Sequence, residues 1–341
     1  MHRCSAVLSL IVVHTLTLTA EAERRPNYAI SEAPDASASL FIQTPFEAGG
    51  EYDGLIFVDI GLNGRDARFI LDTGAPALIL NSAHFPDETA EAEGEAVGVS
   101  GKIQLRQIAI DELDWQGIKR RDIELIGIDL AHLETAVDSE IVGLIGYNTV
   151  KDFELLIDYP DRRLTLFRPG ATNLHRDVQP LAEIPFTLEA HIPVIEVEID
   201  GETLRLGLDT GAAVNLLDPT AFASLDTTAY RSKGEDVLHG ADKNANTVPL
   251  VEVLETEISG LRFADMLTSV ADISHLNNGY GLQLDGLIGF PFLSQRRISI
   301  NFAERKLYVW DAAAEVSPAS VSGASSASGP EPSHRSSTAS S

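Results

Sequence analysis

Two aspartates in the chain could form a catalytic pair, because each ends an apolar run and precedes Thr-Gly. Asp72 lies in "FILDTGAPALIL" (69–80) and Asp209 lies in "LRLGLDTGAAVNLL" (204–217). A single Asp-Thr-Gly is weak evidence, since Asp and Gly are common in surface turns. Two carboxyl groups in contact are different, because they cannot both ionise easily and share one proton over a wide pH range. Such a pair offers a general base for water and a general acid for a carbonyl oxygen, which is the chemistry of amide hydrolysis.

The two motifs stand at equivalent positions of an internal repeat. They are separated by 137 residues (209 − 72 = 137), and a two-residue turn begins nine residues before each aspartate, Asn63-Gly64 in one copy and Asp200-Gly201 in the other. Both dipeptides favour tight hairpins, because their residues tolerate positive φ. Alternating apolar residues on both sides of each turn predict strands. We therefore expect each aspartate at the end of the second arm of a β-hairpin.

The repeat extends well beyond the hairpins. Segments 44–48 and 184–188 look like matching first strands, and 143–167 parallels 286–310 with a Gly-Leu-Ile-Gly, a short helical stretch and a further hairpin. The repeating unit spans about 125 residues and consists mostly of short strands. The sequence thus predicts two all-β domains with one or two short helices each. If the copies face each other across a pseudo-twofold axis, identical loops meet there, and Asp72 meets Asp209.

These paired motifs resemble the aspartic peptidases of the pepsin and retropepsin type. The nearest likeness is to bacterial retropepsin-like proteins with two such domains in one chain, and it covers residues 42–310. The resemblance implies two pseudo-twofold-related acid-protease β-barrel lobes with short helices. It also implies that Asp72 and Asp209 are the catalytic dyad.

The resemblance assigns supporting roles to the neighbouring residues. Thr73 and Thr210 would bond to the opposite loop and keep the carboxyl groups coplanar, while Gly74 and Gly211 would allow close backbone approach with their amides near the carboxylates. The two Gly-Leu-Ile-Gly segments, 143–146 and 286–289, would pack behind the loops.

The residue after each Asp-Thr-Gly differs from the pepsin pattern. Ala75 and Ala212 occupy positions where pepsins usually carry Ser or Thr, and both are candidates for substrate contact. A hydroxyl there would stabilise the carboxylate charge, so its absence predicts a dyad with less acidic pKa values. We expect activity at mildly acidic pH.

Two glycine-rich segments, 94–102 and 234–247, lie where flaps would close over a peptide. Neither holds the aromatic residue of a pepsin flap. His239 lies in the second segment, and a solvent-exposed loop histidine is the favoured interpretation over a functional one.

The chain ends and the overall charge complete the prediction. The formal net charge of −26 argues against nucleic acid or an anionic membrane as partner. The start of the chain resembles a cleavable export signal that contains the sole cysteine, Cys4. The Ser/Ala/Pro-rich end is too poor in bulky apolar residues to fold.

The predicted organisation is a signal peptide (1–22), a linker or short pro-segment (23–41), an N-terminal lobe (42–168), an inter-lobe linker (169–181), a C-terminal lobe (182–311) and a disordered tail (312–341).

The sequence therefore predicts an exported aspartic endopeptidase, periplasmic or secreted, that acts on a peptide or protein substrate. We expect a monomer with an internal pseudo-dimer, no cofactor or metal, no nucleic-acid partner and no stable membrane insertion after signal cleavage. The alternative is a catalytically silent peptide-binding protein of the same fold.

Overall fold

The computed structural model of the chain describes residues 4–6, 12–13, 41–50, 52–86, 89–97, 102–168, 170–241 and 244–318. Of the predicted signal peptide, only two short strands are described, β1 (Cys4–Ala6) and β2 (Val12–Val13); its other residues lie outside the described ones. The predicted linker or pro-segment also lies outside them, apart from its last residue. Within the described residues, no helix has both the length and the apolar character needed to cross a bilayer.

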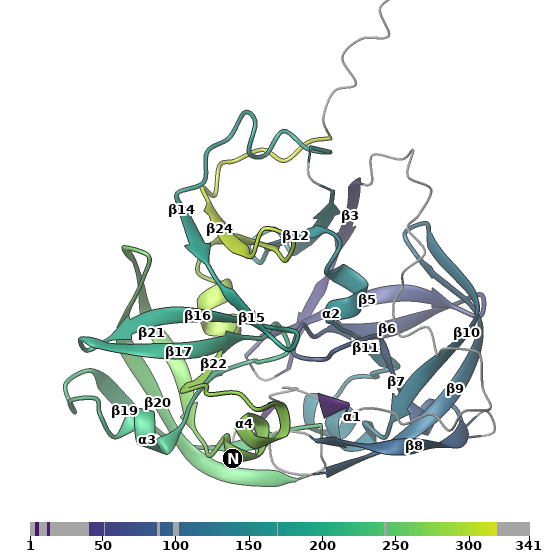
Figure 1. The fold of residues 1–341 in the computed structure, drawn as a ribbon, viewed down its shortest axis with the longest axis horizontal. Coiled ribbons are helices and arrows are strands. Elements are labelled where there is room, and N and C mark those ends of the chain that lie inside the picture. The colour runs from purple at the N-terminus through teal and green to yellow at the C-terminus, as the bar shows by residue number, and fades with distance from the viewer. Residues whose placement is uncertain are drawn as a thin grey trace, which may run out of the picture.

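Two nine-stranded sheets form two lobes, which lie side by side in Figure 1. In the N-terminal sheet the spatial order is β2, β8 (Thr89–Val97), β9 (Lys102–Trp115), β10 (Ile118–Ile128), β7 (Ile79–Asn81), β11 (Gly143–Ile145), β6 (Arg65–Leu71), β5 (Leu55–Leu62) and β4 (Glu47–Gly49). In the C-terminal sheet it is β1, β19 (Tyr230–His239), β20 (Ala245–Ile258), β21 (Leu261–Val270), β18 (Asn215–Leu217), β22 (Gly286–Ile288), β17 (Glu202–Leu208), β16 (Ile192–Ile199) and β15 (Thr187–Glu189). Apart from the outermost strands β1 and β2, the two sheets arrange their strands in the same order, so the lobes share one topology.

A third sheet of six strands joins the lobes, and each lobe contributes three strands to it. Its order is β14 (Ala182–Pro185), β24 (Lys306–Trp310), β23 (Arg297–Asn301), β12 (Glu154–Asp158), β13 (Arg163–Phe167) and β3 (Phe41–Pro45). The central pairing of β12 with β23 is antiparallel and crosses from one lobe to the other.

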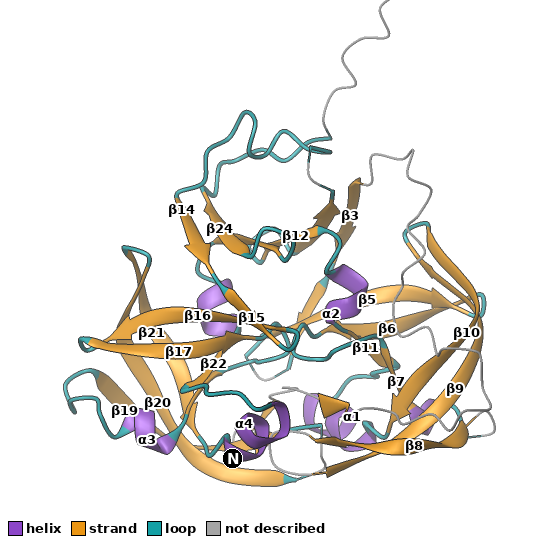
Figure 2. Ribbon diagram, in the orientation of Figure 1, coloured by secondary structure: helices purple, strands orange, loops and turns teal. Residues whose placement is uncertain are grey.

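Helices are few and short, as Figure 2 shows. They are the 3-10 helix η1 (Ser82–His84) and the α-helices α1 (Ala131–Val137), α2 (Tyr147–Val150), α3 (Pro219–Phe222), α4 (Ser274–Tyr280) and α5 (Phe290–Leu293). The fold is a two-lobe, all-β architecture, as the sequence predicts.

The predicted hairpin turns before the aspartates are confirmed. Asn63 and Gly64 have φ of 48° and 77°, and Asp200 and Gly201 have φ of 54° and 79°. Positive φ at both central residues defines the turn that matches the twist of a two-stranded hairpin. The turns join β5 to β6 and β16 to β17, which pair antiparallel.

The segments 44–48 and 184–188 match as expected, but each contains parts of two strands and not one. In each lobe the segment divides at a buried phenylalanine, Phe46 or Phe186, and its two halves join different sheets. The first half enters the six-stranded sheet and the second half enters the sheet of its own lobe. Each phenylalanine inserts its side chain into the core, and this bend redirects the chain.

Aromatic contacts between the lobes follow the repeat. Tyr147 meets Phe302 and Tyr159 meets Phe290, each edge to face with ring centroids 5.2 Å apart. Tyr147 corresponds to Phe290 in the repeat and Tyr159 corresponds to Phe302, because both pairs are separated by the same number of residues (290 − 147 = 143 and 302 − 159 = 143). The lobes therefore contact each other through equivalent residues, as a pseudo-twofold relation requires.

The first part of the predicted tail, residues 312–318, is ordered. Within 312–318, the carbonyl of Glu315 accepts a hydrogen bond of 2.7 Å from the Asn173 side chain, and the amide of Ser317 donates one of 2.9 Å to it. The prediction of disorder from residue 312 is therefore wrong for this first part, because backbone hydrogen bonds hold it on the inter-lobe linker. The remainder of the tail lies outside the described residues.

The inter-lobe linker also packs against the folded body. Ala171 and Leu174 are buried in a small apolar cluster with Trp310. Trp310 and Trp115 are each only 1% exposed, so both are packing residues.

Candidate active site

The two aspartates occupy the same place in each lobe. Asp72 directly follows β6 and Asp209 directly follows β17. The amide of Asp72 donates to the carbonyl of Ile145 at 3.0 Å, and the amide of Asp209 donates to that of Ile288 at 3.0 Å. Each loop is thus tied to the Gly-Leu-Ile strand of its own lobe. Both aspartates are fully buried.

The loops meet so closely that each glycine faces the carboxyl group of the other lobe. A Cβ placed on Gly74 would lie 2.7 Å from Cγ of Asp209, and one on Gly211 would lie 2.8 Å from Cγ of Asp72. Real Cβ atoms do not come this near to a carboxyl carbon, so only glycine fits at either position. The absence of a side chain therefore lets the two carboxyl groups approach.

The two threonines cross-link the loops. The Thr73 amide donates to Oγ1 of Thr210 at 2.9 Å, and the Thr210 amide donates to Oγ1 of Thr73 at 3.1 Å. The Thr210 hydroxyl in turn donates to the carbonyl of Leu71 at 2.9 Å. These reciprocal bonds hold the aspartates, one residue earlier in each loop, at a fixed separation.

The carboxyl groups also receive backbone hydrogen bonds within their own loops. Oδ1 of Asp72 accepts from the Ala75 amide at 3.1 Å, and Oδ1 of Asp209 accepts from the Gly211 amide at 2.8 Å. These donors fix the orientation of both carboxyl groups and favour their charged forms.

Burial and the neighbouring carboxyl group oppose that effect. Burial, followed by the charge of Asp209 and a hydrogen bond between the two side chains, raises the pKa of Asp72 well above its ordinary value. Two carboxyl groups buried this close to each other do not both ionise easily. The pair is therefore arranged so that one carboxyl group keeps a proton while the other is ionised.

The Gly-Leu-Ile-Gly segments lie directly behind the loops. A Cβ on Gly146 would be 2.2 Å from the carbonyl oxygen of Ala77, and one on Gly289 would be 2.3 Å from that of Ala212. Such distances leave no room for a side chain, so the last glycine of each segment is required for close packing. The two segments support the loops from behind, in the position that the resemblance implies.

Ala75 and Ala212 are fully buried in apolar clusters behind the carboxyl groups. Substrate binding by these two residues stays a prediction.

The two predicted flap segments lie on long hairpins. The first hairpin consists of β8 and β9, and its tip lies outside the described residues. The second consists of β19 and β20. His239 is the last residue of β19 and is half-buried, so the interpretation of a solvent-exposed loop histidine is wrong. Burial, together with the charge of His132, lowers its pKa.

The tip of the second hairpin reaches across to the N-terminal lobe. Nε2 of His132, on α1, lies 2.8 Å from the carbonyl oxygen of Gly240. Ala241 is only 1% exposed and packs in the cluster that contains Leu130 and Leu133 of the N-terminal lobe. The C-terminal hairpin thus docks on the opposite lobe.

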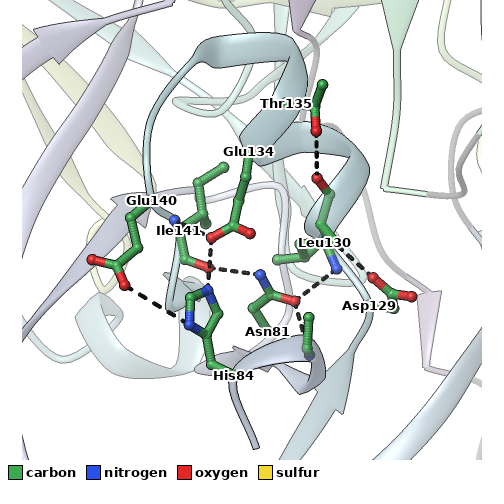
Figure 3. A network of polar contacts seen from close by, with 10 residues as sticks. Asn81, His84, Asp129, Leu130, Glu134, Thr135, Glu140 and Ile141 are labelled. Atoms are coloured by element: carbon green, nitrogen blue, oxygen red, sulfur yellow. Dashed lines mark hydrogen bonds and ion pairs between the residues drawn. The ribbon is translucent and has the colours of Figure 1, made fainter.

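Figure 3 shows the polar network that holds α1 in place for this contact. The Asn81 side chain accepts from the Leu130 amide at 2.9 Å and donates to the carbonyl of Ile141 at 2.9 Å. Glu134 accepts from the Ile141 amide at 2.8 Å and contacts Nε2 of His84 at 2.7 Å. The N-terminal end of α1 is therefore fastened to β7, and Glu134 in its middle is fastened to η1 and to the segment that follows the helix.

Sequence reasoning missed one residue beside the site, His191. It lies between β15 and β16, is 6% exposed, and its Nε2 is 2.7 Å from the carbonyl oxygen of Gly74 in the other lobe. No motif marks it, and the contact joins residues 117 positions apart.

Part of the chain is similar to a known protein family. The family model described as aspartyl protease matches residues 195–292, which include the second Asp-Thr-Gly loop and its Gly-Leu-Ile-Gly segment. This part of the chain is similar to the aspartyl protease family. Among solved structures, basic 7S globulin from soybean is similar with a TM-score of 0.45 and 10% identity, over 80% of this chain and 95% of that chain. A search of curated proteins found no match.

Proposed function

We propose that the protein is an aspartic endopeptidase in which Asp72 and Asp209 act together on one water molecule. The ionised carboxyl group takes a proton from water as the water attacks the peptide carbonyl, and the protonated one donates to the carbonyl oxygen. Collapse of the tetrahedral intermediate, with a proton delivered to the nitrogen, then breaks the C–N bond. The reaction needs no group that this chain does not supply.

The observation that carries the proposal is the mutual approach of the two loops. A Cβ on either glycine would lie within 2.8 Å of the opposite carboxyl carbon, and burial together with the charge of Asp209 raises the pKa of Asp72. A purely structural turn gains nothing from burying two carboxyl groups against one another, since burial of like-charged groups is unfavourable. Catalysis benefits from it, because the pair presents an acid and a base at one point.

Three further features belong to the proposal. The shared strand order and the exchanged aromatic pairs support an internal repeat within a monomer. The charge and apolar pattern at the start of the chain supports export to the periplasm or the medium. A peptide or protein substrate is the partner that this chemistry requires.

The test is cleavage of an unfolded protein substrate across pH by the wild type and by Asp72→Asn and Asp209→Asn. We expect wild-type cleavage at mildly acidic pH that a statine-type inhibitor blocks, and no cleavage by either variant. Circular dichroism would show that the variants keep the fold. Cleavage that persists in both variants would contradict the proposal, and a wild type that binds the inhibitor without cleaving would indicate the peptide-binding alternative.

A further inference from the structure

His191 is a buried imidazole that connects the two lobes next to the dyad. Its Nε2 lies 2.7 Å from the carbonyl oxygen of Gly74. A carbonyl oxygen can only accept a hydrogen bond, so Nε2 carries the hydrogen and donates. Gly74 is the residue whose backbone lies against the carboxyl group of Asp209.

Two aromatic rings fix the position of this imidazole. The Tyr280 ring lies edge to face with it at a centroid distance of 5.3 Å, and the Tyr147 ring is tilted to it at 6.1 Å. Tyr147 also holds the same loop, since its amide donates to the carbonyl of Ala75 at 2.8 Å. Burial lowers the pKa of His191 to about 4, so the ring is neutral over the mildly acidic range.

The equivalent position in the other lobe holds a glycine, and its contact with the opposite loop is of a different kind. The repeat offset places Gly54 opposite His191 (191 − 137 = 54), and a Cβ on Gly54 would lie 2.9 Å from Cα of Ala213. On that side the backbone itself contacts the opposite loop, and no side chain fits. At this position of the repeat, a side chain therefore holds only the loop that contains Asp72, and that side chain can be substituted.

We propose that His191 is a positioning residue for the dyad. Its hydrogen bond fixes the carbonyl of Gly74, and thereby the loop whose amides face the Asp72 carboxyl group and whose glycine faces that of Asp209. This inference rests on the proposed function. It goes beyond that function because the pepsin and retropepsin motif in this sequence assigns no role to this position.

The first test compares His191→Leu with His191→Gln in steady-state cleavage of one peptide. Leucine leaves the Gly74 carbonyl without its donor, whereas the side-chain amide of glutamine reaches a similar point and donates. We expect His191→Leu to lower kcat at least tenfold with KM within about twofold of the wild type, because the lost hydrogen bond acts on the loop that carries Asp72. His191→Gln should recover most of kcat. We also expect the acidic limb of the pH–rate profile of His191→Leu to move up by about half a pH unit, since the loop amides then stabilise the Asp72 carboxylate less well.

A core variant on the neighbouring strand, Val197→Ala, controls for general destabilisation, since Val197 is fully buried in β16. We expect it to lower the unfolding midpoint without moving the pH–rate profile. A His191→Leu variant whose kcat and acidic limb equal those of the wild type or of this control would overturn the inference.

Titration of the aspartate carboxyl groups by carbon-13 NMR separates this inference from the proposed function. It reads the pKa values of the pair whether or not the protein cleaves peptides. A higher pKa of the first ionisation in His191→Leu, restored in His191→Gln, supports the positioning role even in a catalytically silent protein. Unchanged pKa values in His191→Leu would overturn that role even in an active one.

Discussion

Gly74 of the N-terminal lobe lies against the carboxyl group of Asp209 in the C-terminal lobe, and a Cβ at Gly74 would be 2.7 Å from Cγ of Asp209. Gly74 therefore forms part of the surroundings of the Asp209 carboxyl group. Because Gly211 and Asp72 repeat the relation at 2.8 Å, each lobe forms one wall of the other's carboxyl site.

Gly74→Ala should separate the two carboxyl groups and abolish most activity. The added methyl group has no room, so one loop must move, and we expect kcat/KM to fall at least a hundredfold. The matched control is Gly64→Ala, where a Cβ meets nothing within 4 Å but φ is 77°. That variant should lose about 1 kcal/mol of stability and keep its kcat/KM. Wild-type activity in Gly74→Ala would contradict the close approach of the loops.

Thr210→Val should destabilise the protein through the cross-link between the loops. The hydroxyl accepts from the Thr73 amide and donates to the Leu71 carbonyl, and valine leaves both groups buried without this partner. We expect the free energy of unfolding in urea to fall by about 2 to 4 kcal/mol, with Thr210→Ser within about 1 kcal/mol of the wild type. Thr203→Val, at an exposed position of β17, is the control and should change little. Equal losses in Thr210→Val and Thr203→Val would refute the cross-link.

Ala75→Ser should move the activity of the protein to lower pH. A hydroxyl donor beside the Asp72 carboxyl group stabilises its charge, so the acidic limb of the pH–rate profile should shift down by about 0.5 to 1 unit. Ala212→Ser is expected to act in the same direction from the other lobe. Ala77→Ser, at another buried alanine of the same loop, serves as control. If both serine variants keep the wild-type acidic limb, the explanation of mildly acidic activity by the missing hydroxyls is wrong.

His191 should make the stability of the protein depend on pH between about 4 and 6.5. Its pKa is lowered by burial from 6.5 to about 4 in the folded state. Above pH 6.5 the ring is neutral in both states and contributes no pH dependence. As the pH falls towards 4, the unfolded chain gains a proton that the folded chain does not, so the free energy of unfolding falls by up to about 3 kcal/mol. The ring contacts the Gly74 carbonyl and the Tyr147 and Tyr280 rings.

Urea unfolding of the wild type and of His191→Gln at several pH values measures this contribution. The difference between the two proteins in free energy of unfolding should change across the range and level off below pH 4. Parallel curves for the two proteins would show that the histidine takes up its proton normally in the folded state.

Local sequence signals predicted much of the fold. The Asn63-Gly64 and Asp200-Gly201 turns lie where the dipeptides place them, because the turn type depends on the two central residues alone. The position of each aspartate after a hairpin follows from the same turns and the alternating apolar residues.

Features that depend on distant contacts were not predictable in this way. The six-stranded sheet pairs β12 with β23 and β13 with β3, and no local pattern states which strands become neighbours. The chain divides at Phe46 and Phe186 for the same reason, since the bend is a response to packing. The His191 contact with Gly74 depends on the arrangement of both lobes, so a lone histidine between two strands gave no signal.

The central claim is that Asp72 and Asp209 act as one unit, and a double-mutant cycle on peptide cleavage tests it most directly. Rates of one peptide substrate are measured for the wild type, Asp72→Asn, Asp209→Asn and the double variant, with each fold checked by circular dichroism. Because neither carboxyl group can do its part alone, each single variant should lose at least about a thousandfold in kcat, and the double variant should lose no more than either single one. Independent losses that multiply in the double variant, or a single variant that keeps wild-type kcat, would contradict the account.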